Sequence, residues 1–282
     1  MRVQLQEYRP IPALQPYVQR FWAGRFEGHG ACGAGCLAQR VVPNGFLEII
    51  IHLTDHHCDL PGRAGWGQSP DYTLIGVQSE PYEVRFTSEV EVFGIRFKPA
   101  GFHTLFEVPL SELVNTHEDL VAVLGARFRT FAARLRAEPD TEGRLEAAER
   151  YLGRAAERRA VTYLNRAEEL IRASGGRLRV ADVADRLCIS RRQLERAFQH
   201  TLGMSPKQYA RIARLNLVQS LFQEGRYRGL ADVAYRAGYA DQSHFNREFK
   251  RLVGEPPTRY LARQSAYAVN APAAGGRAVR LR

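Results

Sequence analysis

The sequence contains few cysteines and no long apolar run. Its 282 residues include four cysteines, too few for a disulfide scaffold in a chain of this length, and we expect reduced thiols. No apolar run reaches the roughly 18 residues that span a bilayer, and the N-terminus lacks the apolar segment of a signal peptide. We therefore expect a cytoplasmic protein with no membrane partner.

A metal-binding histidine pattern is also missing. A metal-dependent enzyme of the cupin type needs clustered ligands, such as a His-x-His pair followed by a glutamate, and no such pair occurs. The residues nearest to a zinc-binding spacing are Cys32, Cys36, His52, His56, His57 and Cys58. The two cysteines lie in a glycine-rich segment and the histidines in a different one, and nothing in the sequence brings them together. We expect no metal, no cofactor and no catalytic residues.

Charge is distributed unevenly between two halves of a chain long enough for two domains. Residues 1–160 contain 18 Lys and Arg against 20 Asp and Glu, a net charge of −2, whereas residues 161–282 contain 22 against 10, a net charge of +12. A basic half suits a polyanionic partner. An anionic membrane would attract it too, but no lysine-rich amphipathic stretch is present. Nucleic acid is the favoured partner.

One motif occurs twice in the basic half. The first copy, VADVADRLCISRRQLERAFQHTLGMSPKQY, begins at Val180, and the second, LADVAYRAGYADQSHFNREFKRLVGEPPTRY, begins at Leu230. Arg196 of the first copy corresponds to Arg247 of the second. Each copy predicts a short helix, a tight turn and a second helix, so the region is an internal repeat of a two-helix unit. A helix-turn-helix that reads DNA needs this arrangement.

The second helix of each copy has an apolar and a polar face. Leu194 with Phe198, and Phe245 with Phe249, are four residues apart and therefore lie on one face, toward the core. The opposite face carries side chains that can read base edges. The predicted DNA-contacting residues are Arg191, Arg192, Glu195, Arg196, Gln199, Gln242, Ser243, His244, Asn246 and Arg247. Solvated arginines, or ion pairs with Glu195 and Glu248, are the alternative for Arg196 and Arg247.

A single long helix is predicted between the two copies. Ser205 suits its N-cap, Pro206 its first position and Gly225 its end. About twenty residues span about 30 Å, close to the ~34 Å between successive major-groove faces on one side of DNA. One chain can therefore place Arg196 and Arg247 in adjacent major-groove segments.

The region from about Ala160 to Arg263 resembles the DNA-binding domain of the AraC/XylS family of bacterial transcription regulators. The segment DVAYRAGYADQSHFNREFKRLVGEPPTRY follows the family signature almost position by position. The resemblance implies base contacts to a double-stranded operator from Arg192, Glu195, Arg196, Gln242, Ser243, His244 and Arg247. Glu195 departs from this chemistry, since it either accepts from a cytosine amine or weakens the grip of the first unit.

The N-terminal part reads as short strands separated by turns. Segments such as YVQRFWAGRFE, FLEIIIHL and VEVFGIRFKP are β-branched or aromatic, which predicts an antiparallel sandwich or small barrel. The stretches PNGFLEIIIHL and GIRFKPAGFHTLF resemble the cupin-like sensor domain common in the same family. We therefore expect an α+β multidomain protein: an antiparallel, cupin-like β-barrel over residues 1–110 and an all-α, double helix-turn-helix domain over residues 160–264.

Candidate effector-binding residues lie in the predicted barrel. Glu48 and His52 are four apart in a strand and share one face, which suits either the wall of a pocket or a surface pair. The full set of candidates is Trp22, Glu48, His52, Trp66, Arg85 and Arg96. Core packing is the alternative for the aromatic members.

Residues 111–159 have a helical period. Thr116 and Asp119 suit a capping box, and apolar stripes follow at Leu120, Leu124, Phe128, Phe131 and Leu135 and at Leu145, Ala148, Leu152 and Ala155. These stripes pack either against a second subunit, giving a homodimer, or against their own barrel. Residues 265–282 are rich in Ala, Gly and Pro, and we expect a disordered tail.

The leading interpretation is a sequence-specific transcription regulator controlled by a small-molecule effector or by dimerisation, with operator DNA and RNA polymerase as partners. A metal-dependent cupin-type enzyme with a DNA-binding tail and a cysteine-based DNA-repair sensor are the alternatives. The effector, the operator and the sign of regulation stay open.

Overall fold

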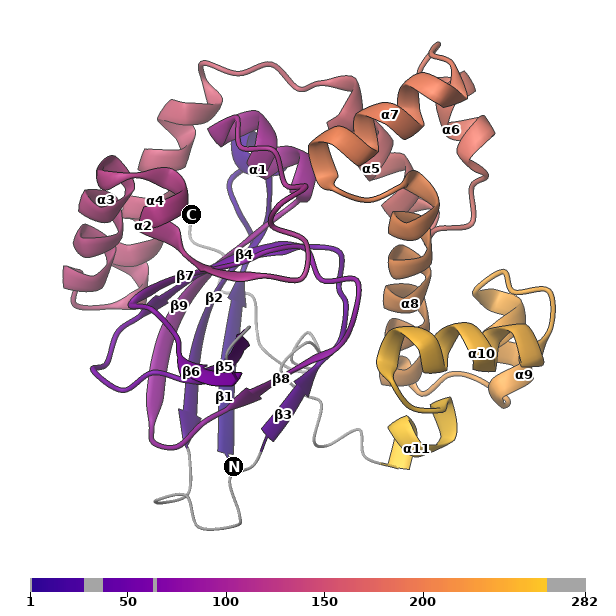
Figure 1. Cartoon of the computed structure of the whole chain (residues 1–282), viewed down its shortest axis with the longest axis horizontal. Helices are drawn as coiled ribbons and strands as arrows, with labels where there is room; N and C mark the ends of the chain where they lie inside the picture. Colours follow the sequence, from indigo (N-terminus) through magenta and orange to yellow (C-terminus); the bar gives the residue numbers. More distant parts are fainter. Residues whose placement is uncertain (1, 28–37, 63–64, 263–282) are drawn as a thin grey trace.

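The computed structural model describes residues 2–27, 38–62 and 65–262. Cys32, Cys36 and the predicted tail therefore lie outside the described residues. The N-terminal part is built from two antiparallel sheets, and the C-terminal part is entirely helical (Figure 1). Within the described ranges, no helix is both long and apolar enough to cross a membrane.

The larger sheet has six strands in the order β1-β2-β9-β4-β7-β10. Their bounds are Arg2–Tyr8 (β1), Val18–Glu27 (β2), Val90–Phe97 (β9), Leu47–His52 (β4), Tyr72–Ile75 (β7) and His117–Asp119 (β10). The smaller sheet has the order β3-β8-β5-β6, with strands Ala38–Val41 (β3), Tyr82–Arg85 (β8), Asp59–Gly62 (β5) and Gly65–Gln68 (β6). No strand pairing among the described residues joins the two sheets, so the antiparallel sheet is confirmed but a closed, cupin-like barrel is not.

The side chains of strand β4 show that the two faces of the larger sheet have different surroundings. Successive side chains of a strand point to opposite sides, and both sides of β4 are buried. Leu47, Ile49 and Ile51 belong to the main hydrophobic core, shared with the helices. Glu48 and His52 point the other way and line a cavity. Such near-continuous apolar sequence is typical of a strand covered on both faces.

Helices cover the first of these faces. They are α1 (Pro99–Phe106), α2 (Leu120–Leu124), α3 (Ala126–Ala137) and α4 (Thr141–Ala156), with a short 3₁₀ helix η1 (Pro12–Leu14). The capping box predicted from Thr116 is wrong: Asp119 alone caps α2, accepting from the backbone N–H of Val121 at 2.8 Å. Thr116 is displaced from this role because the chain still pairs with β7 over His117–Asp119.

The apolar stripes of α3 and α4 pack on their own sheet. Phe128, Phe131 and Leu135 of α3 and Leu145 and Leu152 of α4 are buried in the same core as β4. This arrangement favours the second alternative drawn from the sequence, since the stripe that was a candidate for subunit pairing is already covered.

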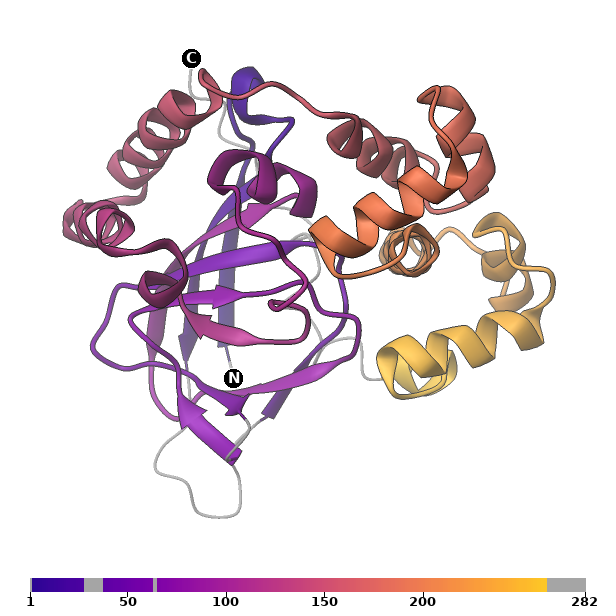
Figure 2. The ribbon, with the colours of Figure 1, turned by 45° about the horizontal axis from the view of Figure 1, so that its top comes forward.

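The C-terminal part has the predicted doubled motif. It comprises α5 (Tyr163–Ala173), α6 (Val180–Arg186), α7 (Arg191–Leu202), α8 (Pro206–Glu224), α9 (Leu230–Arg236), α10 (Gln242–Val253) and α11 (Pro257–Ala262). The long helix α8 begins at its Ser205 N-cap, whose hydroxyl accepts from the N–H of Gln208, and ends at Gly225 in the left-handed conformation. Figure 2 shows α8 between the first unit, α6 and α7, and the second, α9 and α10.

The main core continues from the sheet into the first helix-turn-helix unit. One cluster of buried side chains runs from Phe93 and Ile95 of the sheet to Ile171 of α5 and Phe198 of α7. The second unit has a separate core around Phe222, Val233, Phe245 and Phe249, which the N-terminal part joins only through Val42 among the described buried residues.

Candidate nucleic-acid interface and sensor cavity

The two reading helices, α7 and α10, begin and end in the same way. Ser190 caps α7 through the N–H of Gln193, and Asp241 caps α10 through the N–H of His244. Each helix ends at a glycine with positive φ, Gly203 and Gly254, as expected of left-handed helix C-caps. These four signals make both helices begin and end at matching points of the repeat.

Helix α7 keeps its apolar face inside and its polar face outside. Leu194 and Phe198 are fully buried, while Arg192 and Arg196 are exposed and form no side-chain hydrogen bond or ion pair within the described chain. Glu195 pairs with Arg191, Nε to Oε1 at 2.8 Å. The acidic residue therefore neutralises Arg191 and leaves Arg196 available.

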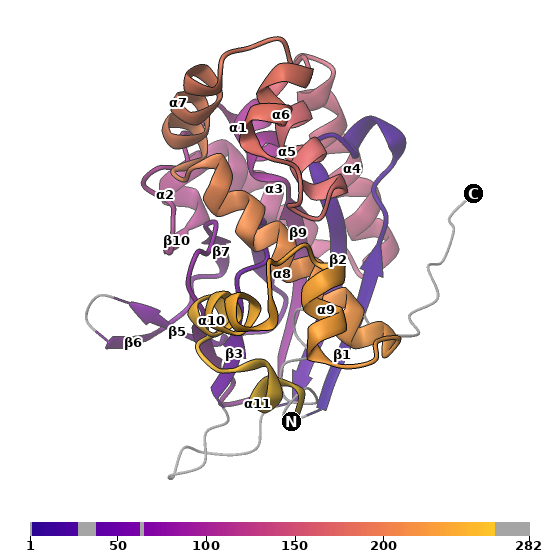
Figure 3. The same ribbon diagram turned by 90° about the vertical axis from the view of Figure 1, so that its right-hand side faces the viewer.

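In helix α10, Gln242, Ser243 and Arg247 are exposed, and Arg247 has no side-chain partner in the described chain. Asn246 lies at the margin of this face, because its Oδ1 is buried and has no hydrogen-bond partner. Figure 3 presents α7 and α10 on the same side of the molecule, at opposite ends of α8.

Helix α10 is fixed to α8 by the buried carboxylate of Glu248, which the sequence considered alone suggested only as a partner for Arg247. Glu248 Oε2 lies 3.2 Å from Arg211 Nε of α8 and 3.9 Å from His244 Nε2. Burial and then the Glu248 carboxylate raise the pKa of the neighbouring Tyr239. Glu248 thus pairs with α8 rather than with Arg247, and His244 is partly engaged in the same group. The sequence feature that indicates this pairing is a glutamate on the inward face of a helix that is otherwise basic.

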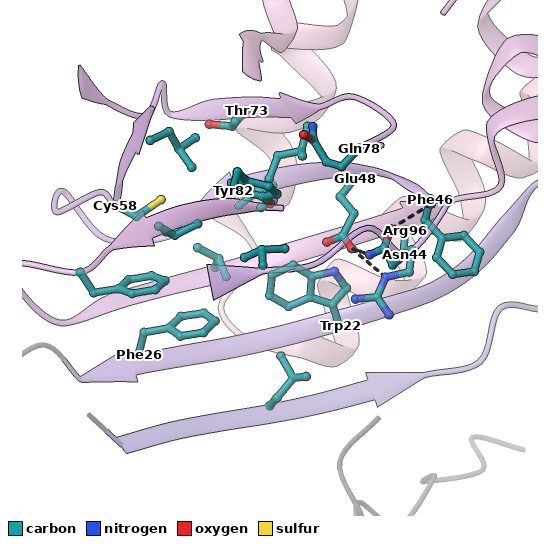
Figure 4. Close-up of a pocket in the computed structure, with 18 of the residues that line it drawn as sticks. Trp22, Phe26, Asn44, Phe46, Glu48, Cys58, Thr73, Gln78, Tyr82 and Arg96 are labelled. Atoms are coloured by element: carbon teal, nitrogen blue, oxygen red, sulfur yellow. Dashed lines mark hydrogen bonds and ion pairs between the residues drawn. The ribbon is translucent and has the colours of Figure 1, made fainter. Parts of the chain in front are cut away.

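A cavity of about 60 Å³ lies on the inner face of the larger sheet. Four of the six predicted effector residues line it: Trp22, Glu48, His52 and Arg96. Figure 4 shows the indole of Trp22 beside the Glu48 and Arg96 pair, with Phe26 and Cys58 further along. Most of the remaining wall is apolar and comes from both sheets.

The indole of Trp22 lies flat over Gly94, its partner on the adjacent strand. A Cβ at position 94 would lie 2.0 Å from Trp22 Cε2, so only glycine admits the ring here. The indole N–H is buried and has no hydrogen-bond partner in the described chain. This donor is available to an acceptor inside the cavity.

A buried ion-pair group closes one end of the cavity. Arg96 Nε lies 2.8 Å from Glu48 Oε1 and Arg96 Nη1 lies 3.3 Å from Glu7 Oε1. Burial opposes the charge of Arg96, but the two carboxylates outweigh it and raise its pKa. Two carboxylates and one guanidinium make this end polar and hold the ends of β1, β4 and β9 together.

His52 and Cys58 line the other end of the cavity, and the buried Ser69 lies behind them. His52 Nε2 lies 3.2 Å from Ser69 Oγ, which lies 3.4 Å from Cys58 Sγ. Burial, and then the neighbouring His57, lower the pKa of His52 to about 4, while burial raises the pKa of Cys58 to about 11. A neutral thiol is a poor nucleophile. Among the described residues, no group of three or more potential ligands is placed to hold a metal.

Trp66 and Arg85 lie apart from this cavity. They belong to β6 and β8 of the smaller sheet, and the guanidinium of Arg85 stacks 3.6 Å above the Trp66 ring. Trp66 is 39% exposed. The structure therefore brings these two residues together with each other and away from the other four candidates.

Comparison with known proteins matches two parts of the chain. Residues 183–263 match a helix-turn-helix domain family and residues 6–119 a domain of unknown function (DUF6597). The probable transcriptional regulator LumQ of Photobacterium leiognathi is 34% identical over 84 residues, 30% of this chain and 34% of LumQ. A putative AraC-like transcription regulator of Streptomyces lividans is 37% identical over 81 residues, 29% of this chain and 26% of the relative. The chain thus matches about a third or less of these relatives' length.

Among solved structures, ToxT from Vibrio cholerae O395 aligns over 92% of this chain and 97% of ToxT, with a TM-score of 0.48 and 14% identity. A further relative found by sequence, the activator RhaS of Yersinia pestis, is 34% identical over 77 residues, 27% of this chain and 28% of RhaS.

Proposed function

Because the chain belongs to the AraC/XylS family of transcriptional regulators, we propose that it binds operator DNA and regulates transcription. The observation that carries this proposal is the pair of exposed helices α7 and α10 at the two ends of α8. Arg196 and Arg247 lie at equivalent positions of these helices and have no side-chain partner among the described residues. Helix α8 has 19 residues and is therefore about 28 Å long. That length suits two reading helices in successive major-groove segments on one face of DNA.

The distribution of charge supports the same partner. Residues 161–282 have 22 basic against 10 acidic residues, and a positive surface attracts the phosphate backbone whatever the sequence. Base contacts from Arg192, Arg196, Gln242, Ser243 and Arg247 would then supply the specificity. The other predicted contacts differ. Arg191 is paired with Glu195, and Gln199 Nε2 donates to Gly203 O at 3.3 Å. His244 and Asn246 are partly engaged or turned inward.

A small-molecule effector would bind in the cavity beside Trp22. Its walls are mostly apolar, while the free indole N–H and the Glu48–Arg96 pair provide polar groups at one end. Ligand sites commonly combine an apolar lining with a few polar groups that fix orientation.

Direct contacts give such an effector a route to the reading helices. The N–H of Leu110 donates to Thr201 O at the end of α7, and a Cβ on Gly203 would lie 2.7 Å from Ser111 Cα. At the end of α10, a Cβ on Gly254 would likewise lie 3.2 Å from Arg40 Nη1. An effector that prefers one arrangement of these contacts would shift the population of DNA-binding states.

Selection of bound duplexes from a random pool by the full-length protein tests the proposal. We expect an enriched site of two half-sites about one helical turn apart, and affinity that falls about 10³-fold or more between 50 and 200 mM salt if about six phosphates are contacted. A pool without enrichment, or binding that ignores salt, would contradict the proposal.

A further inference from the structure

A second, polar hollow lies between the sensor sheet and the DNA-binding half. This interdomain groove has a volume of about 390 Å³. One wall comes from β1, β2, β9 and the segment Asn44–Phe46, and the other from α5, α8 and the turn after α5. No residue of α7 or α10 lines it. A ligand here would contact both halves without occupying the reading helices.

The groove is strongly cationic. Its lining includes Arg20, Arg96, Arg172 and Arg177 but only one acidic residue, Glu7. Arg96 is already neutralised by Glu48 and Glu7. Arg20 is held only loosely by Glu7, at 3.8 Å. Arg172 also has the carboxylates of Glu168 and Glu169 nearby. Within the lining of the groove itself, Arg20, Arg172 and Arg177 still outnumber the single carboxylate of Glu7.

Arg172 lines this groove, and two of its guanidinium nitrogens form no hydrogen bond with the described residues. Its Nη2 donates to Gln19 Oε1 at 2.9 Å, and its guanidinium lies 4.7 Å above the ring of Phe46. Its Nε and Nη1 are buried and have no hydrogen-bond partner in the described chain. Burying unpaired donors of a charged group is costly, so acceptor oxygens at this position would stabilise the arrangement. Arginine is suited to carboxylates and phosphates.

We propose that the interdomain groove binds a small polar dianion through Arg172 and Arg20. Its ligand is a molecule with two carboxylates or one phosphate group, because the lining is polar and the cations come from both walls. The apolar cavity beside Trp22 is suited to a different chemistry. The groove thus constitutes a second ligand site that ties β2 to α5.

Binding would have a regulatory consequence, which rests on the proposed function. A dianion that contacts both walls binds only while the sheet and α5 are docked, and it therefore favours the docked arrangement. Operator affinity should change when the ligand is present. The binding itself does not depend on this consequence.

Calorimetric titration of the full-length protein tests the site directly. The probes are inorganic phosphate and succinate, with acetate as a monoanion control at matched ionic strength. We expect saturable binding of at least one dianion, and a rise in Kd of about tenfold to a hundredfold in Arg172→Gln, the value of one or two charge-assisted hydrogen bonds. Arg166→Gln, an exposed arginine on the same helix, should bind like the wild type.

A variant on the opposite wall keeps the test valid if Arg172→Gln fails to fold. Arg20→Gln changes a partly exposed side chain of β2 and should also weaken binding. Failure of the wild type to bind either dianion, equal affinity in Arg172→Gln and Arg166→Gln, or equal binding of acetate would each overturn the proposal. Operator binding, measured without any dianion, is a separate readout: its absence would overturn the proposed function but leave a positive titration intact.

Discussion

At the scale of single residues, the proposed reading of base sequence depends on Arg196 and Arg247. Arginine can donate two hydrogen bonds to guanine, and losing such a contact reduces discrimination by about 1–3 kcal/mol. We expect Arg247→Ala to weaken binding to the best site by that amount and to change binding to random DNA little. Arg196→Ala should act on a different base pair.

Fluorescence anisotropy with duplexes mutated one base pair at a time measures this. Arg166→Ala is the control, because Arg166 is exposed and belongs to α5 rather than to either reading helix. Equal losses on specific and random DNA would make Arg247 a phosphate contact. Loss at the same base pair in both variants would contradict the model of two separate reading helices.

Gly94 determines whether Trp22 can line the cavity. A methyl group at position 94 would lie 2.0 Å from the indole, so Gly94→Ala must displace a buried ring. We expect a loss of about 1–3 kcal/mol in the free energy of unfolding, typical of overpacking. Gly67→Ala is the control, since a Cβ there meets nothing within 4 Å, and it should change stability by less than about 0.5 kcal/mol. Urea unfolding of both variants decides; equal effects would contradict the packing seen.

At the scale of elements, Glu168 joins three helices. It is fully buried on α5, accepts from the N–H of Ala100 in α1 at 2.9 Å and accepts from the hydroxyl of Tyr209 in α8 at 2.8 Å. Burial raises the pKa of this carboxyl, although Arg172 and the two donors oppose the shift. A carboxyl of the C-terminal part thus caps a helix of the N-terminal part.

Removing this carboxyl should loosen the junction. Glu168→Ala leaves two buried donors without an acceptor, and we expect a loss of about 2–4 kcal/mol in the free energy of unfolding. Its neighbour provides the control: Glu169 pairs with Lys98 at 3.0 Å with 55% of its side chain exposed, and Glu169→Ala should cost less than about 1 kcal/mol. Similar losses in the two variants, measured by chemical denaturation, would show that Glu168 does not hold the helices together.

Strands β4 and β10 each contain a histidine that folding keeps neutral. Burial lowers the pKa of both His52 and His117 from 6.5 to about 4. The unfolded chain therefore binds more protons than the folded one between these values. The contribution of each neutral histidine to the free energy of unfolding is therefore complete above about pH 6.5. It is lost as the pH falls toward 4, by about 1.4 kcal/mol per pH unit for each histidine.

Urea titrations at several pH values measure this slope. His117→Gln should reduce it, whereas replacement of the exposed His56 by Gln should leave it unchanged. A slope that is the same in all three proteins would show that His117 does not titrate with folding.

The elements that sequence could predict are those specified locally. Ser205, Pro206 and Gly225 define α8 without reference to the rest of the chain, and the repeat defines α6, α7, α9 and α10. Contacts between distant segments had no such signal. The pairing of Glu248 with Arg211, the capping of α1 by Glu168 and the separation of Trp66 from Trp22 depend on how the elements pack. Thr116 was misjudged because a capping pattern was outweighed by strand pairing with β7.

At the scale of the whole molecule, the boundary expected near residue 160 divides the chain but not its hydrophobic core. Leu164, Ile171 and Phe198 lie in one buried cluster with Phe93 and Phe102 of the N-terminal part. Domain limits of 1–110, 111–159 and 160–264 therefore remain a proposal about sequence segments. The two helix-turn-helix units are unequal, because only the second has a core largely its own.

A fragment of residues 160–263 should therefore be partly unfolded. We expect its first unit to lose cooperative unfolding, since removing residues 1–159 exposes apolar side chains that contribute about 25 cal/mol per Å² when buried. A fragment of residues 205–263 is the comparison, because it keeps most of the second core. Amide hydrogen exchange measures both; full protection of α5 and α7 in the longer fragment would contradict this expectation.

The shared core also bears on how such a regulator can be recombined. A chimera that exchanges N-terminal parts at residue 160 would place one protein's sheet against another's α5 and α7, so that the shared core would combine side chains of two proteins. A junction at Gly203–Ser205, in the turn before α8, would instead carry the first unit along with its sensor. The N-terminal part and the first helix-turn-helix unit would then be transferred together. The part that can be exchanged would be α8 with the second helix-turn-helix unit.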